Sequence, residues 1–238
     1  MQLAIIVMMA AVIAGVVQSV TGFGAGILIM MVLPYFFPVM TSSAISGSIT
    51  TVLSIGLAWS YRKHIHKELI AWPLVGYILT STLTIRYLSG LKSEVMLRLL
   101  GICLIGLALY FLFFSDRIHV KGTKTTAILC AALSGFLGAA FGMSGPPMVI
   151  YYLAVLDKKE EYLGTIQTFF SIGGLYVFAQ RMLNGIYTLD MVPLTLLGIM
   201  AILLGKGIGR RIMDRIDEKV MRKIIYLFLI FTGVLNLF

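Results

Sequence analysis

Residues 2–37 read QLAIIVMMAAVIAGVVQSVTGFGAGILIMMVLPYFF: a long apolar run, the glycine-rich break TGFGAG at residues 21–26, and a shorter apolar run. At about 1.5 Å per residue, residues 2–20 are long enough to cross a hydrocarbon core of about 30 Å, whereas residues 26–37 reach about half way. Glycine at this density interrupts helical hydrogen bonding. This stretch predicts a membrane-spanning helix followed by a short, broken one.

The rest of the chain continues this pattern. Of its 238 residues, 59% are hydrophobic and 12% charged, and the mean hydropathy is +0.98, which is more apolar surface than a soluble fold can bury. The N-terminal residues lack the basic region and cleavage site of a secretory signal, so we expect them to begin a permanent span. The sequence predicts an all-α, polytopic membrane helix bundle. Its ten apolar segments cover residues 2–20, 26–37, 42–61, 69–88, 94–114, 125–141, 146–156, 163–183, 188–206 and 219–238.

The two halves of the chain resemble each other. A shift of 120 residues places Gly22 on Gly142 and Pro73 on Pro193, and the two short segments fall at matching positions. Each half holds five segments, and an odd number makes the second copy run through the bilayer upside down. We therefore predict two inverted-topology repeats, each with a short broken helix hairpin. The predicted units are residues 1–115, a cytoplasmic linker at 116–124, and residues 125–238.

The positive charge follows the predicted loops. If residues 62–68 are cytoplasmic, alternation also places the linker, residues 157–162 and residues 206–223 inside, and these four regions hold 15 of the 19 Lys and Arg residues. This is the positive-inside pattern, so the net charge of +9 reflects the membrane and not nucleic acid. It predicts a multi-pass protein of the cell (inner or plasma) membrane with both termini outside. The four remaining cations are Arg86, Lys92, Arg98 and Arg181.

Two breaks precede the short segments. The first is Thr21–Gly26, and the second is Phe141–Pro147, with the sequence FGMSGPP. Free backbone groups at membrane depth are tolerated only where protein buries them or where they line a wet cavity. Helix ends exposed in this way offer N–H donors to an anion, and paired broken helices indicate a transporter's substrate site. The alternative is that these glycines serve close helix packing alone.

Uncharged polar residues cluster near both breaks and suit the oxygens of an anion. Ser46 and Thr50 in the helix after the first short segment are matched by Thr165 and its neighbours after the second. Each hydroxyl could instead bond to its own helix. The predicted substrate-binding residues are Gln18, Ser19, Thr21, Gly22, Phe23, Gly24, Gly26, Ser48, Thr51, Gly142, Met143, Ser144, Gly145, Pro146, Gln167, Thr168, Ser171 and Arg181.

Charge inside the predicted spans is nearly absent. Arg86, Arg181 and Lys206 fall at segment ends, where their side chains are expected to reach the lipid headgroups. Arg181, in an outer loop with no other cation, is a candidate for attracting anions. The nearest residue to a buried carboxylate is Asp190, so both facilitated diffusion and coupling to an ion held by the backbone stay open.

The sequence argues against an enzyme. Residues 142–145 have the GxSG spelling of intramembrane serine proteases, but a serine nucleophile needs a base, and the histidines His64, His66 and His119 fall in cytoplasmic loops, whereas Ser144 is predicted near the outer side. No grouping of Cys, His and carboxylates suggests a metal, and no cofactor is predicted.

The first break is followed by Pro34, and a similar glycine-rich pattern recurs from Gly135 to Pro147. With these motifs the chain resembles the TauE/SafE membrane proteins. The resemblance covers essentially the whole chain. It implies transport of sulfur-containing anions such as sulfite, organosulfonates and thiosulfate. The matching positions are the glycines and prolines of the two breaks, but many relatives have glycine where this chain has Ser144.

We therefore predict a membrane transporter, in the export direction, of small and above all sulfur-containing anions, working by alternating access around the two breaks. The alternative is a non-transporting membrane scaffold or subunit of a larger complex. The predicted partners are a small anion and the lipid bilayer, while a homo-oligomer stays open.

Overall fold

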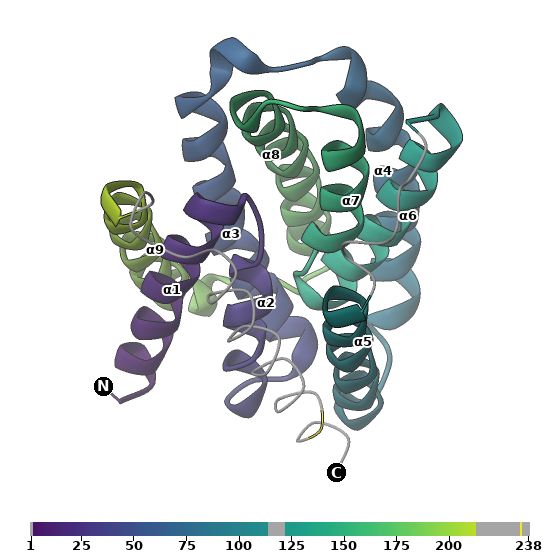
Figure 1. Ribbon diagram of the computed structural model, residues 1–238. Helices are drawn as coiled ribbons and strands as arrows, with labels where there is room; N and C mark the ends of the chain where they lie inside the picture. The colour runs from purple at the N-terminus through teal and green to yellow at the C-terminus, as the bar shows by residue number, and fades with distance from the viewer. Residues whose placement is uncertain (1, 114–121, 213–233, 235–238) are drawn as a thin grey trace.

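The computed structural model describes residues 2–113, 122–212 and 234 (Figure 1), and within them every regular element is a helix. The predicted all-α, polytopic class is confirmed. Residues 116–121 of the linker and the tenth segment, apart from residue 234, lie outside the described residues. The elements are α1 (Gln2–Thr21), α2 (Ala25–Met30), η1 (Leu33–Tyr35), α3 (Val39–Ser60), η2 (Arg62–His64), α4 (Glu68–Leu88), α5 (Ser93–Phe113), α6 (Lys124–Phe141), α7 (Gly145–Val155), α8 (Lys159–Leu183), η3 (Leu189–Met191) and α9 (Val192–Ile212).

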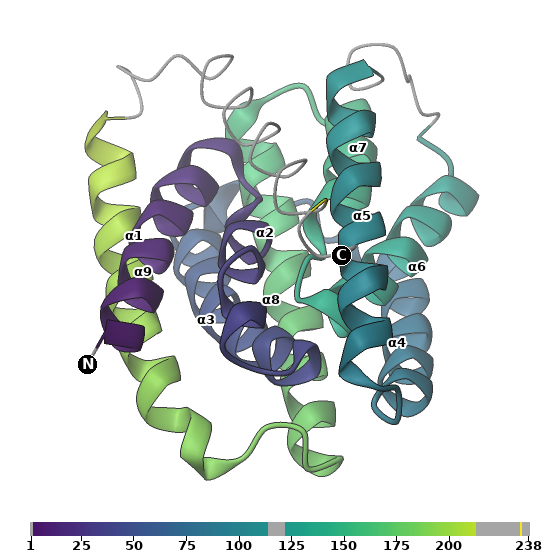
Figure 2. The same ribbon diagram turned by 90° about the horizontal axis from the view of Figure 1, so that it is seen from below.

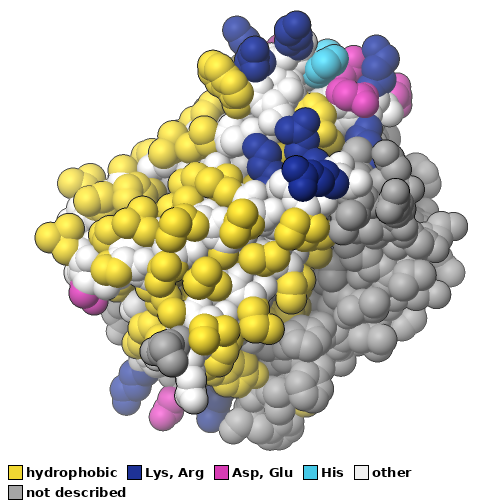
Figure 3. Space-filling model, turned by 90° about the vertical axis from the view of Figure 1, so that its left-hand side faces the viewer, with side chains coloured by type: hydrophobic (Ala, Val, Ile, Leu, Met, Phe, Trp, Pro, Cys, Tyr) yellow, Lys and Arg dark blue, Asp and Glu magenta, His cyan; other side chains and the backbone are white. Residues whose placement is uncertain are grey.

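Five helical stretches in the described chain are long and apolar enough to cross a membrane, namely α1, α3, α4, α6 and residues 189–211. Large apolar side chains face outward along these helices, among them Ile13, Leu79, Leu133 and Leu204. Figure 3 shows a broad hydrophobic band on one face, with Lys and Arg gathered above it and a few charges below it. An apolar band of this kind belongs in lipid.

The short segment at 26–37 is more broken than the sequence predicted. Helix α2 ends at Met30, and a separate 3-10 turn, η1, contains Pro34. Proline has no N–H to continue the helix and disfavours helical backbone at the residue before it, while Pro38 starts α3 three residues earlier than expected. The predicted segment is therefore one short helix and a turn.

The helices pack in pairs: α1 lies along α9, α4 along α6 and α3 along α8. Small residues set the closest approaches, since a Cβ on Gly15 would overlap the carbonyl of Ile202, and a Cβ on Gly76 would lie 2.7 Å from the carbonyl oxygen of Ile128. In Figure 2 the end of α9 and the loop 156–158 lie at one end of the bundle, and the loops 89–92 and 184–188 at the other.

Lys206 does not extend to the headgroups as expected. Its Nζ donates to the carbonyl of Gly56, 2.6 Å away, in the last turn of α3. The same carbonyl also accepts from the hydroxyl of Ser60, and a cation near a helix C-terminus interacts favourably with the helix dipole. Lys206 therefore holds α9 against the end of α3.

Candidate functional site

The first break turns the chain back after α1. Gly22 has φ 83° and Gly24 has φ 100°, left-handed values that residues with a Cβ rarely adopt. The N–H of Gly22 still donates to the carbonyl of Gln18, 2.8 Å away, so α1 closes normally before the reversal. Within the described chain the N–H groups of Gly24, Ala25 and Gly26 have no hydrogen-bond acceptor. This break therefore leaves backbone donors free, as predicted.

The second break is built differently. Gly142 ends α6 in the left-handed region (φ 66°), and the N–H groups of Gly142 and Met143 donate back to the carbonyls of Gly138 and Leu137, in the manner of a glycine C-cap. Helix α7 then begins Gly145-Pro146-Pro147. Proline suits a first turn but has no N–H. The second break therefore offers fewer backbone donors than its sequence predicted.

The two breaks meet inside the bundle. Gly26 lies so close to the carbonyl of Gly142 that a Cβ could not fit between them, and a Cβ on Gly145 would lie 3.1 Å from the Cβ of Phe23. Segments about 120 residues apart in sequence are therefore in direct contact. Glycine at position 26 is required by this approach and not by its backbone angles.

A cavity of about 60 Å³ lies beside this contact, with room for roughly four water molecules or a small oxyanion. All of its lining residues are buried or half-buried. It is lined by Gln18, Phe23, Gly24, Gly26, Ile27, Gly47, Thr50, Thr51, Ser54, Tyr77, Gly138, Gly142, Met143, Ser144, Gly145, Phe170, Gly174, Val177, Phe178 and Arg181.

Arg181 is the charged residue of the lining, and its predicted place in an outer loop was wrong. It lies in the last turn of α8, 1% exposed. Its Nη1 donates to the carbonyl of Ser43 (2.8 Å), and its Nη2 to the hydroxyl of Ser43 (2.9 Å) and to the carbonyls of Gly138 and Ala139 (3.1 and 2.9 Å). In the described part of the chain its Nε has no partner and no carboxylate pairs with it. A buried cation with neutral partners alone is costly.

The two predicted glutamines touch each other. The side-chain amide of Gln18 donates to the Oε1 of Gln167 (3.3 Å) and to the hydroxyl of Ser54 (3.1 Å). The amide of Gln167 donates to the carbonyl of Gly22, 2.6 Å away, and the hydroxyl of Tyr162 donates to the carbonyl of Thr21 (3.2 Å). Gln18 lines the cavity, while Gln167 does not line it and holds the first break through the carbonyl of Gly22.

Ten of the eighteen predicted residues line the cavity, and eight do not. Most of the eight are hydroxyl residues with an acceptor in their own helix, as the alternative interpretation held, and the hydroxyl of Thr21 also lies 2.8 Å from the carbonyl of Phe23 in the break. Gly22 packs against Tyr162 and Leu163, and Pro146 is buried in the first turn of α7. The hydroxyls of Ser19, Thr21, Ser48, Thr168 and Ser171 donate to the carbonyls of Val16, Val17, Ala44, Gly164 and Gln167.

One helical face of α3 was predicted only in part, because Thr50 and Thr51 were named from the sequence but Gly47 and Ser54 were not. Gly47, Thr50, Thr51 and Ser54 line the cavity at spacing i, i+3, i+4, i+7, which places them on one side of a helix. Ser48, which was predicted, is off this face. Tyr77 was also missed, because an aromatic residue in an apolar run carries no signal of a polar site. Metal binding has no support in the described residues, which contain no group of three His, Cys, Asp or Glu able to hold an ion.

Comparison with known proteins gives three findings. A family model described as Sulfite exporter TauE/SafE matches residues 7–235. The chain is 28% identical over 247 residues to a probable membrane transporter protein of Methanocaldococcus jannaschii, covering 95% of this chain and 91% of the relative. It is 26% identical over 149 residues to a probable sulfite/organosulfonate exporter TauE of Cupriavidus necator, covering 60% of this chain and 58% of the relative. No solved structure matches.

Proposed function

The chain belongs to the TauE/SafE family of membrane transporters, and we propose that it exports small oxyanions, above all sulfur oxyanions such as sulfite, through the cavity between the two breaks. The relative from C. necator is named for sulfite and organosulfonates. The cavity of about 60 Å³ suits sulfite or thiosulfate, and bulkier organosulfonates would need it to widen.

The observation that carries this proposal is Arg181. A guanidinium has five N–H donors, and the described contacts use one hydrogen of Nη1 and both of Nη2. The Nε–H and one Nη1–H remain. An anion beside Arg181 would satisfy these donors and neutralise a charge that the described residues leave unpaired. The lining contains no Asp or Glu that would pair with a cation instead.

Transport requires the cavity to open to each side in turn, and we propose that the two halves are inverted repeats that rock against each other. Gly22 packs on Leu163 while Gly142 packs on Ser43, and the shift of 120 residues exchanges these two contacts. The same shift places α1 on α6 and α4 on α9, and the structure pairs α1 with α9 and α4 with α6. This reciprocity supports a two-fold relation between the halves.

The direct test is flux by the purified protein alone. Radiolabelled sulfite is loaded into proteoliposomes, and its release is compared with release from protein-free liposomes and in the presence of excess sulfate, thiosulfate or methanesulfonate. We expect protein-dependent, saturable release that sulfur oxyanions inhibit. A chain that serves as a scaffold would give no release above the protein-free control, and that result would overturn the proposal.

A further inference from the structure

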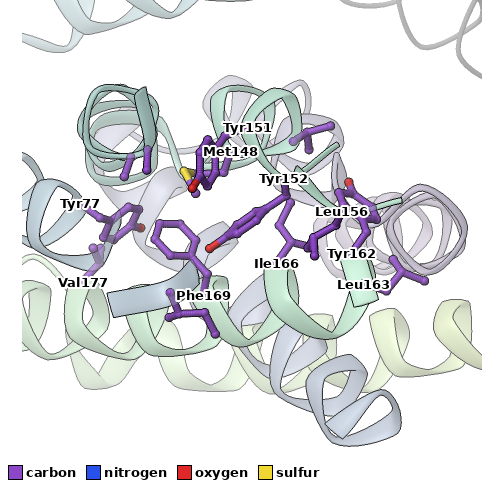
Figure 4. Close-up of a cluster of buried hydrophobic side chains, with 14 of the residues drawn as sticks. Tyr77, Met148, Tyr151, Tyr152, Leu156, Tyr162, Leu163, Ile166, Phe169 and Val177 are labelled. Atoms are coloured by element: carbon purple, nitrogen blue, oxygen red, sulfur yellow. The ribbon is translucent and has the colours of Figure 1, made fainter. Parts of the chain in front are cut away.

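Tyr77 reaches the cavity from a tightly built aromatic cluster. Its ring lies edge-on to Phe169 with centroids 5.3 Å apart, and Phe169 in turn packs against Tyr152 at 6.1 Å. Figure 4 shows Tyr77, Phe169 and Tyr152 side by side, contributed by α4, α8 and α7. Tyr77 is 3% exposed, yet it lines the cavity. Its ring is therefore fixed on three helices while its hydroxyl faces the site.

Glycines form a slot for this ring. A Cβ on Gly173 would lie 2.7 Å from the Cε1 of Tyr77, and a Cβ on Gly138 would lie 2.8 Å from its hydroxyl. Real Cβ contacts are longer than this, so both positions admit the tyrosine only because they are glycine. Such a slot holds the hydroxyl in one place, which is what a directional hydrogen bond to a ligand requires.

The hydroxyl of Tyr77 is paired with the hydroxyl of Ser144, 3.1 Å away. Ser144 is itself held in place, because the hydroxyl of Ser134 donates to its carbonyl. Two hydroxyls carry two hydrogens, and the bond between them uses one. Whichever residue donates, one O–H is left over, and both residues line the cavity.

We propose that Tyr77 and Ser144 form a hydroxyl pair that determines specificity by donating its spare O–H to an oxygen of the bound anion. This inference rests on the proposed anion transport and names the acceptor chemistry the site prefers. Arg181 supplies charge to any anion, whereas a fixed O–H favours an anion with directional oxygen acceptors. Oxyanions should therefore be selected over halides of the same charge.

The test compares Tyr77→Phe with Tyr152→Phe in the flux assay. Both variants remove a hydroxyl from a buried tyrosine of the same cluster, but the hydroxyl of Tyr152 donates to the carbonyl of Leu69, outside the cavity. We expect Tyr77→Phe to raise the KM for sulfite roughly tenfold or more, as for loss of a hydrogen bond to a charged group, while inhibition by bromide is unchanged. Tyr152→Phe should leave the ratio of sulfite to bromide affinity as in the wild type.

Ser144→Ala gives a second, independent measurement. Each single variant keeps one O–H but loses the hydroxyl that orients it, so Ser144→Ala should lower the same ratio, and the double variant, which has neither O–H, should lower it further. If neither single variant changes the sulfite to bromide ratio in a protein that transports sulfite, the inference is overturned and anion transport stands. If the wild-type protein moves no anion, the proposed function fails first.

Discussion

Arg181 donates to both oxygens of Ser43, the carbonyl at 2.8 Å and the hydroxyl at 2.9 Å, although the two residues are 138 positions apart. The same guanidinium bonds to the end of α6 through Gly138 and Ala139. One buried side chain of α8 thus ties α3 to α6 at the edge of the cavity. A planar fork of donors is needed for such a contact, and lysine does not provide it.

Replacing Arg181 should separate charge from geometry. We expect Arg181→Gln to reduce sulfite flux about 100-fold, as when one partner of a buried charge contact is removed, and Arg181→Lys to reduce it about tenfold because the charge stays but the fork is lost. Losing a buried charge offsets losing its hydrogen bonds, so the melting temperature should shift little. Arg98→Gln, at an exposed position on α5, is the control. Equal flux in the Arg98 and Arg181 variants would contradict the site.

Ser43 competes with an anion for the N–H groups of Arg181. Three acceptors share the two hydrogens of Nη2, so Ser43→Ala leaves one fewer competitor for a bound anion, and the KM for sulfite should fall modestly, by about two- to threefold. Ser42 is equally buried, but its hydroxyl donates to the carbonyl of Phe37. Ser42→Ala should change stability alone. A KM that stays the same or rises in Ser43→Ala would show that the guanidinium does not exchange serine for substrate.

The sequence predicted the helices better than the residues inside them. Apolar runs cut to membrane thickness locate α1 and α4 nearly to the residue, because hydropathy and length report on lipid. The apolar run at residues 26–37 continues through Pro34, so hydropathy could not show that α2 ends at Met30. Local backbone restrictions at proline decided that boundary.

The site was predicted where backbone chemistry is visible and missed where packing decides. The glycines of both breaks are rare residues with a conformational reason to be there. Arg181 falls near the end of the predicted segment 163–183, where a cation is expected to reach the headgroups, and only the fold shows that its side chain turns inward. Tyr77 is identified by the glycines around it, on α6 and α8, which no local pattern connects to it.

The contact between the breaks should tolerate no added atom. Gly26→Ala would place a methyl group on the carbonyl of Gly142, and overpacking of this kind costs about 1–3 kcal/mol or more. We expect a lower melting temperature and loss of sulfite flux. Gly106 on α5 has nothing within 4 Å of an added Cβ, so Gly106→Ala should change neither. If both variants behave alike, the two breaks are not in contact in the membrane.

Replacing Gln167 tests whether this residue supports the first break or binds the substrate. Its amide donates to the carbonyl of Gly22 and its oxygen accepts from Gln18, so Gln167→Leu should leave buried groups unpaired at a cost of about 1–3 kcal/mol. We expect a lower melting temperature and maximal rate, with the KM within about twofold, because Gln167 does not line the cavity. Thr168, next in sequence, bonds to Gly164 of its own helix, so Thr168→Val should be nearly neutral. A tenfold rise in KM for Gln167→Leu would instead make Gln167 a ligand of the anion, and the cavity would then have to extend behind the first break.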